Sequence, residues 1–328
     1  MTIDRVGEAI GRNDLDELTR IVDDLARDRR WDELLVLRDR TRRAFDESGR
    51  QLWPAASFAE YRVALHGPDA LLGDVLTPDA GFLAPGPLTE VAAQHHSWAD
   101  AGPYLPVGPM TAVFAHERAV RGELIDELVD AADVYSAPLR RARWEPEYLL
   151  PEYRTDGVEI PSPDPVRGRP LTAGNERAKP IEEHDACDAL RAVVAAWATA
   201  SDARVAVAAV EGGVGAAIEA LGAVEARGAW LSPQEALIRL AWAGASGGAR
   251  GRRRGGAAGR DAAWQAAIAI AGFDPFDTVP EDELSAALDE LRWCAWHAAD
   301  ALVGHVLRIA VEDPLDGIAF AIDAVDPA

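Results

Sequence analysis

Six arginines and not one carboxylate lie between Ala236 and Arg260, in a chain of 328 residues whose formal charge is -22. A guanidinium group makes paired N–H contacts to phosphate or carboxylate, and glycines let backbone N–H groups approach the same anion. We therefore expect an arginine–glycine loop that contacts an anionic ligand or an acidic protein surface. The arginines that carry this expectation are Arg250, Arg252, Arg253, Arg254 and Arg260.

The same stretch allows other interpretations. In so acidic a chain the arginines have internal partners too, among them the acidic connector at residues 143–180, the C-terminal strands and another copy of the chain. Gly251, Gly255 and Gly259 recur every four residues. If the helix that follows began before Gly251, these glycines would form a groove in which another helix could pack closely. Each glycine would destabilise that helix by about 1 kcal/mol relative to alanine. The remaining interpretation is a flexible, solvated loop.

A glycine turn is the second candidate binding element. Residues 204–210 (RVAVAAV) have the pattern of a buried strand, Gly213 and Gly215 follow as G-x-G, and a helix comes next. Strand, glycine turn and helix N-terminus are the parts of a phosphate cradle. The third glycine of the dinucleotide fingerprint is missing, because Ile218 stands there, so a plain structural turn is the competing interpretation.

Two catalytic hypotheses use residues near these elements. An enzyme acting on a nucleotide or a phosphorylated metabolite would use the glycine turn as cradle and His297, Asp300 or His305 as acid or base. Ser246 fits the G-x-S-x-G pattern of a nucleophile elbow, which requires a strand before the serine and a helix directly after it. A helical segment precedes Ser246 and a glycine–arginine loop follows it, so we expect no elbow.

Other chemistry lacks its residues. Lys179 is the only lysine, which excludes a G-x-x-x-x-G-K-[ST] phosphate loop, a kinase lysine and an S-x-x-K dyad. His95 and His96 are adjacent and would point about 100° apart on a helix. His116 begins H-E, but Val120 stands where a zinc helix needs its second histidine. We expect no metal and no cofactor.

Composition limits the partners and the compartment. The excess of Asp and Glu over Lys and Arg makes nucleic acid an unlikely partner, because phosphate binding depends on basic side chains. Two cysteines, Cys187 and Cys294, give no disulfide framework and suit a reducing cytoplasm. The first residues lack the apolar core of a signal peptide, and no run reaches the roughly 20 apolar residues of a membrane-spanning helix.

The elements that must position these residues are predicted by periodicity. In the first half we expect helices from Leu15, from Trp31 to Ser48 and after Pro54, a Gly/Pro-rich loop over 66–87 with at most one short helix, and helices at 88–101, 110–121 and 124–134. In the second half we expect helices at 181–199, after Gly215, after the Ser232 cap, after Arg260 and after Pro280, and strands at 204–210, 291–297, 306–312 and 318–324.

These elements predict an α+β fold. A helical domain (1–145, a bundle or helical hairpins) is followed by an acidic, proline-rich connector (146–180) and by an α+β domain (181–328) with a small, mainly antiparallel sheet covered by helices. The favoured function is a non-enzymatic interaction or ligand-binding module that works through the arginine–glycine loop, with homo-oligomerisation left open.

Overall fold

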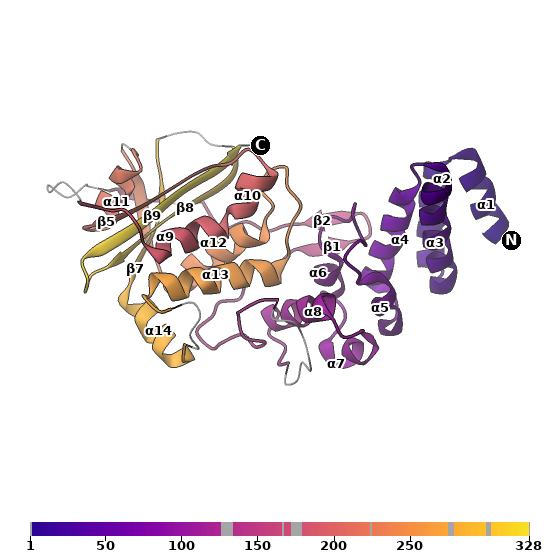
Figure 1. Ribbon diagram of the computed structural model, residues 1–328, viewed down its shortest axis with the longest axis horizontal. Helices are drawn as coiled ribbons and strands as arrows, with labels where there is room; N and C mark the ends of the chain where they lie inside the picture. Colours follow the sequence, from indigo (N-terminus) through magenta and orange to yellow (C-terminus); the bar gives the residue numbers. More distant parts are fainter. Residues whose placement is uncertain are drawn as a thin grey trace. The chain divides into compact units, whose positions relative to one another are not determined.

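The structure of the protein is a computed structural model that describes residues 2–125, 134–165, 167–171, 179–223, 225–274, 279–299 and 303–327. The chain divides into two compact units (Figure 1). Unit 1 holds the described residues up to 134 together with Pro151–Ile160, and unit 2 holds Tyr135–Leu150 and the chain from Pro161 onward. The segment at residues 135–160 is thus divided between the two units.

Unit 1 consists of helices and one small hairpin. Its elements are α1 (Thr2–Arg12), α2 (Leu15–Arg27), α3 (Trp31–Ser48), α4 (Trp53–His66), the 3-10 helix η1 (Asp69–Leu71), α5 (Leu72–Val75), α6 (Leu88–Ala92), α7 (Trp98–Ala101), the 3-10 helix η2 (Gly102–Tyr104), α8 (Pro109–Val120), β1 (Glu152–Arg154) and β2 (Gly157–Glu159).

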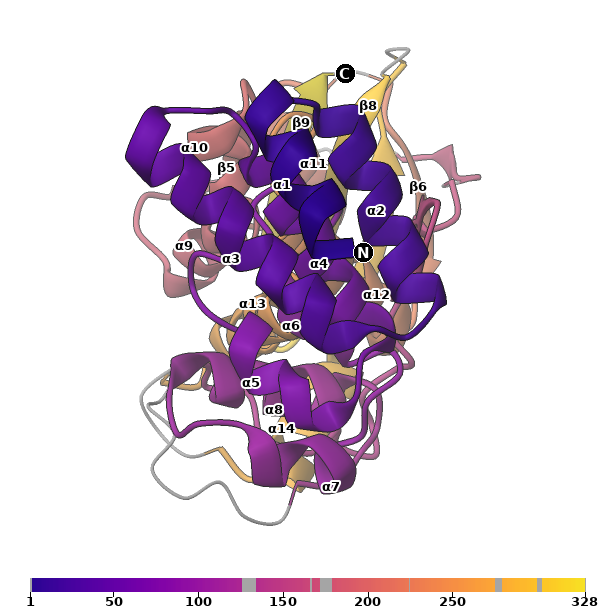
Figure 2. The same cartoon turned by 90° about the vertical axis from the view of Figure 1, so that its right-hand side faces the viewer.

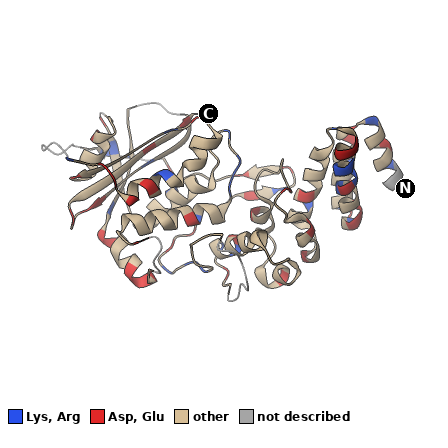
Figure 3. Ribbon diagram, viewed as in Figure 1, with Lys and Arg blue, Asp and Glu red and all other residues tan. Residues whose placement is uncertain are grey.

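Helices α2 and α3 form where periodicity predicts them. The Asp14 side chain accepts a hydrogen bond from the Glu17 N–H and caps α2, and the apolar stripe from Leu18 to Leu25 is buried. Helix α3 ends at Gly49, whose φ of 65° is the left-handed conformation of a helix C-cap. Figures 1 and 2 show α1 to α4 side by side within the unit, and the ribbon colours of Figure 3 show basic and acidic residues interspersed along them.

Two expectations for unit 1 need correction. Helix α1 has no counterpart among the predicted elements, although Ile3, Val6 and Ile10 recur at helical spacing. The single helix expected at 88–101 is two short ones, α6 and α7, separated by a turn at His95 and His96. The helix expected at 124–134 lies mostly outside the described residues.

Unit 2 combines helices with seven of the nine strands found in the described residues. Its elements are β3 (Arg169–Pro170), β4 (Lys179–Ile181), α9 (Asp185–Val193), α10 (Ala195–Ala200), β5 (Arg204–Glu211), α11 (Val214–Ala220), β6 (Arg227–Leu231), α12 (Pro233–Ala245), α13 (Gly256–Ile270), α14 (Glu281–Glu290), β7 (Arg292–His297), β8 (Gly304–Asp313) and β9 (Ile318–Pro327).

The strands of unit 2 form one sheet in the order β3-β6-β7-β8-β9-β5-β4, and every described pairing is antiparallel. Its longest ladder joins β8 to β9 through the turn at 313–317, where Gly317 has a φ of 65°. Strand alternation gives the sheet two apolar faces: Phe320 and Ile322 face a core shared with α9, α12 and α13, and Ala319 faces a smaller core under α11 (Figure 1). The predicted α+β class is therefore correct.

Three expectations for unit 2 are revised. The helix predicted for 181–199 starts at Asp185 and breaks at Val194, because Ile181 belongs to the edge strand β4. Strands β3, β4 and β6 were not predicted, since each has only two to five residues. Helix α13 begins at Gly256, before Arg260, so Gly251 lies outside the helix and the proposed groove of three glycines does not form.

None of the helices in the described parts of the chain combines the length and the apolar character needed to cross a membrane.

Candidate functional site

The arginine–glycine loop, residues 246–255, connects α12 to α13 (Figure 3). Its first residues are held by the carboxylate of Asp326 on β9, which accepts hydrogen bonds from the Ala249 N–H at 2.6 Å and from Ser201 Oγ at 2.8 Å. Its far end is held by a 2.7 Å hydrogen bond from the Arg254 N–H to the Ala245 carbonyl oxygen. Both ends of the loop are therefore fixed to the fold.

Steric contacts explain why glycine stands at two positions of this loop. Gly248 has a φ of 83°, and a Cβ there would lie 2.1 Å from Asp326 Oδ2, so a side chain would displace the anchor. A Cβ on Gly251 would lie 2.0 Å from the carbonyl oxygen of Gly247, where the loop folds back on its own backbone. The expectation of a flexible loop is thus replaced by a tightly folded turn.

The arginines of the loop differ in their surroundings. Arg250 is exposed and forms an ion pair with Asp202. Arg252 and Arg254 are exposed, and Arg253 is half-buried. Arg250, Arg252 and Arg254 thus present their charges at the surface of one short segment.

Arg260, one of the arginines expected to bind an anion, lies in the interior and is paired within the chain. Its side chain is 1% exposed, and its Nε and Nη2 atoms each donate a 2.7 Å hydrogen bond to the two carboxylate oxygens of Glu145. Its remaining hydrogen bonds go to the carbonyl oxygens of Pro138 and Arg140. Although burial favours the neutral form, the hydrogen bonds and charge of Glu145 outweigh it and raise the pKa of Arg260. Arg260 thus ties α13 to an acidic residue of the connector region.

The glycine turn is already in contact with a carboxylate of the same chain, that of Glu312. Gly213 is the N-cap of α11, and Gly215 lies in the first turn of that helix. Glu312 Oε2 lies 3.3 Å from the Val214 N–H, and a Cβ on Gly213 would lie 2.8 Å from the same oxygen. An internal carboxylate therefore takes the position that a bound phosphate would need, and the structure supports the plain-turn interpretation of Gly213 and Gly215.

The residues proposed for an enzyme do not meet. Gly213 is next to the start of β9 on the α11 face, whereas the arginine–glycine loop is anchored at Asp326, near the end of β9 and on the opposite face. His297 and His305 lie on β7 and β8, and Asp300 falls outside the described residues. The pocket that this hypothesis requires, with turn, loop and histidine together, is not formed.

The serine of the G-x-S-x-G pattern is a helix cap. Ser246 follows the last residue of α12, is 8% exposed, and its Oγ accepts a hydrogen bond from the Gly248 N–H at 3.0 Å. A helix and not a strand precedes it, as expected, so the strained turn of a nucleophile elbow is missing.

An aromatic cluster lies between the loop anchor and α12. The rings of His305 and Trp242 stack with centroids 5.4 Å apart and an interplanar angle of 15°, and Trp197 contacts both rings by its edge. His305 is the register partner of Asp326. Burial lowers the pKa of His305, and the charge of Asp326 opposes that shift only in part. Burial at this position therefore favours the neutral form of the His305 ring.

A cavity that sequence reasoning did not find lies where β7 and β8 separate. The ladder between these strands ends at the pair Ala295–Ile309, while β7 continues along β6 and β8 continues along β9. The opening holds about 470 Å³. Its walls come from the connector, α12, β7 and β8: Ser162, Pro163, Asp164, Pro165, Arg239, Trp242, Trp296, His297, Gly304, Val306, Leu307 and Arg308.

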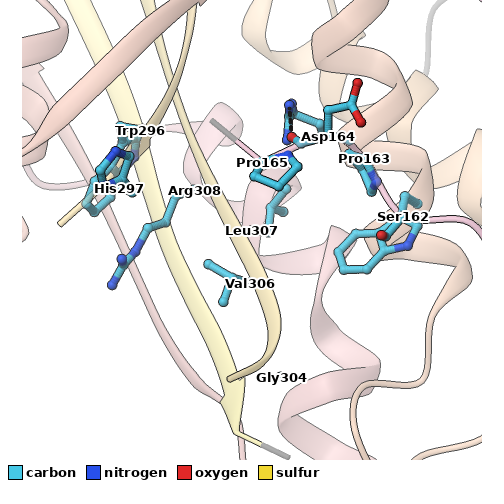
Figure 4. A pocket seen from close by; sticks show the side chains of 12 residues that line it. Ser162, Pro163, Asp164, Pro165, Trp296, His297, Gly304, Val306, Leu307 and Arg308 are labelled. Atoms are coloured by element: carbon cyan, nitrogen blue, oxygen red, sulfur yellow. Dashed lines mark hydrogen bonds between the residues drawn. The ribbon is translucent and has the colours of Figure 1, made fainter. Parts of the chain in front are cut away.

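Two arginines of the cavity wall differ in charge balance. Arg308 donates a 2.7 Å hydrogen bond to Asp323 Oδ1 and lies over the ring of Trp296, 4.9 Å from its centroid. Figure 4 shows it beside Trp296, across the cavity from Asp164. Arg239 donates to the carbonyl oxygen of Asp164 at 2.8 Å, and within the described residues no carboxylate is in ion-pair distance of it.

Other reactive side chains are engaged or covered. Burial raises the pKa of Cys187 and raises that of Cys294 to about 11, which disfavours a nucleophilic thiolate at either position. The Nζ of Lys179 is 2.5 Å from Glu211 on the surface of the sheet edge. His95 stacks on His66 and His96 pairs with Asp69. In the regions that the structure describes, no group of three His, Cys, Asp or Glu side chains is placed to hold a metal ion.

Fold and site together define an α+β protein whose second unit carries a fixed arginine–glycine loop and a separate aromatic-walled cavity. The chain belongs to the family described as a family of unknown function, DUF6183, because that family's model matches residues 16–302. Neither the curated proteins nor the solved structures gave a significant match.

Proposed function

We propose that this protein is a non-enzymatic binding module that contacts an anionic ligand or an acidic protein surface through Arg252 and Arg254. The observation that carries the proposal is the state of Arg254: its side chain is exposed, and no carboxylate forms an ion pair with it in the described chain. Asp261 is close enough for its pKa to be affected by Arg254, but its Oδ1 accepts the N–H groups of Ser136 and Ala137.

The fixed backbone of the loop supports the proposal energetically. Ordering a free loop on binding costs about 0.5–1.5 kcal/mol for each immobilised side chain and more for the backbone. The loop is already held by Asp326 and by its own close contacts at Gly247 and Gly251. The loop backbone therefore needs no further ordering on binding, and a partner meets a preformed cationic surface.

The charge of the whole chain supports a short-range contact. At about 0.15 M salt charges are screened beyond roughly 8 Å, so an anionic group at the loop senses nearby arginines more than the distant acids that make the net charge -22. The cytoplasm remains the compartment we propose, because both cysteines are unpaired and buried.

The proposal is tested with a fluorescein-labelled deca-glutamate peptide and fluorescence polarisation at several salt concentrations. The parent protein is expected to bind with an affinity that falls as salt rises. The double variant Arg252→Ala/Arg254→Ala should lose at least about tenfold, since two charge-assisted contacts disappear.

The matched control is Arg191→Ala/Arg204→Ala, which removes two exposed arginines from α9 and β5 of the same unit. This control changes the net charge equally and should bind as the parent does. Equal losses in the two double variants would show that only net charge matters and would refute the assignment to the loop.

A further inference from the structure

The cavity between β7 and β8 arises from the way these two strands pair in the sheet. β7 runs on along β6 to the pair His297–Arg227, while the first part of β8 pairs only with β9 in the described ladders. The two strands therefore diverge, and α12 and the connector segment 162–165 close over the gap. A volume of about 470 Å³ lies in the range of small-molecule sites, which is about 300–1,000 Å³.

One guanidinium in this wall lacks a counter-charge. Arg239 is half-buried, and within the described part of the chain its guanidinium donates one hydrogen bond, to the neutral carbonyl oxygen of Asp164. Desolvation lowers its pKa, and the charges of Glu235 and Asp164 compensate only in part. A partly desolvated cation without a carboxylate partner is costly, so an anion entering the cavity would gain a charge-assisted hydrogen bond there.

The rest of the wall favours an apolar, ring-shaped body. Trp242 borders the cavity from α12, and Leu307 and Val306 border it from β8 (Figure 4). Trp242 is held in place by the stacked ring of His305 and by the edge of Trp197. An indole fixed in this way is a firm surface for an aromatic ring, and such ring pairs gain about 0.5–1.5 kcal/mol beyond burial of their area.

Charge balance selects a monoanion. The second cation of the wall, Arg308, is already ion-paired with Asp323, whereas Arg239 forms no ion pair with a carboxylate of the described residues. The exposed carboxylate of Asp164 lies in the same wall and would repel a second negative charge. A carboxylate carries one charge at pH 7 and matches the fork of a guanidinium, whereas a phosphate monoester carries nearly two.

We infer that this cavity is a binding site for a small aromatic carboxylate, with Arg239 pairing with the carboxylate and Trp242, Leu307 and Val306 enclosing the ring. No residue of the arginine–glycine loop lines the cavity, so this inference does not depend on the proposed function.

Isothermal titration calorimetry with 2-naphthoate, its neutral amide 2-naphthamide and 2-naphthyl phosphate tests the inference on the full chain. The parent is expected to bind 2-naphthoate at least about tenfold more tightly than the amide, which lacks the charge. It should also bind the acid more tightly than the phosphate ester. Absence of naphthoate binding, or a tighter phosphate ester, would overturn the assignment.

The variant Arg239→Met keeps the length of the side chain and removes its charge. It should lose the preference for the acid over the amide, and Arg239→Lys should keep part of it because a point charge remains. The control Arg191→Met, at an exposed position on α9, should bind as the parent does. An unchanged preference for the acid in Arg239→Met would contradict the role given to Arg239, and Arg252→Ala/Arg254→Ala should leave naphthoate binding intact.

Discussion

Arg260 and Arg239 come from the same cationic stretch and from neighbouring helices, yet their surroundings are opposite. The guanidinium of Arg260 is fully buried, and its Nε and Nη2 atoms each donate a hydrogen bond to one carboxylate oxygen of Glu145. The guanidinium of Arg239 is half-buried at a cavity wall and has one carbonyl oxygen as its acceptor. Between them in sequence lies the arginine–glycine loop, where Arg252 and Arg254 face solvent.

The difference teaches how to tell a structural cation from one available for binding. Glu145 also accepts the N–H of Ala142 and the hydroxyl of Tyr148, each at 2.7 Å, so both carboxylate oxygens are fully used. A network satisfied in this way leaves nothing for a ligand and secures the connector to α13. Arg239 still has unused donors, and an external anion can supply what the fold does not.

The largest effect is expected from breaking the buried pair. Glu145→Ala leaves the charge of Arg260 without a partner in the interior, which should lower the free energy of unfolding by about 3–5 kcal/mol. Urea denaturation followed by circular dichroism measures the loss.

The double variant Glu145→Met/Arg260→Met sharpens this prediction. Removing both charges and filling their space with apolar groups should restore much of the stability lost in Glu145→Ala. If the double variant were as unstable as the single one, the cost would come from packing and not from an unpaired charge.

A smaller effect is expected at the anchor of the loop. Gly248→Ala introduces a Cβ at a φ of 83° and against Asp326 Oδ2, so it should cost about 2–3 kcal/mol by strain and by loss of the Ala249 hydrogen bond. Gly272 has a φ of 77° with no described atom within 4 Å of a Cβ, so Gly272→Ala isolates the conformational cost at about 1 kcal/mol. Thermal unfolding of the two variants measures the difference, and equal shifts would show that Asp326 does not hold the loop.

Sequence reasoning found the elements that have strong local signals. The helix cap at Ser232 depends on neighbouring residues, so one sequence suffices to find it. Short strands such as β6 are stabilised by partners far along the chain, and nothing in their own residues reveals them.

The candidate sites depended on long-range pairing and were predicted less well. The partner of Arg260 is 115 residues away, and Glu312, which occupies the glycine turn, is 98 residues from Val214. The stretch of arginines was visible in the sequence. What no spacing rule gives is the separation of β7 from β8, which brings Arg239 and Trp242 to one cavity.

The smallest expected effect is also the most direct test of the contrast between the two arginines. Urea unfolding without added ligand compares the parent with Arg239→Met and Arg260→Met. We predict that Arg260→Met loses about 3–5 kcal/mol, while Arg239→Met stays within about 0.5 kcal/mol of the parent, because the fold gives Arg239 no carboxylate to lose. A loss in Arg239→Met as large as that in Arg260→Met would contradict the account, since Arg239 would then be a structural residue.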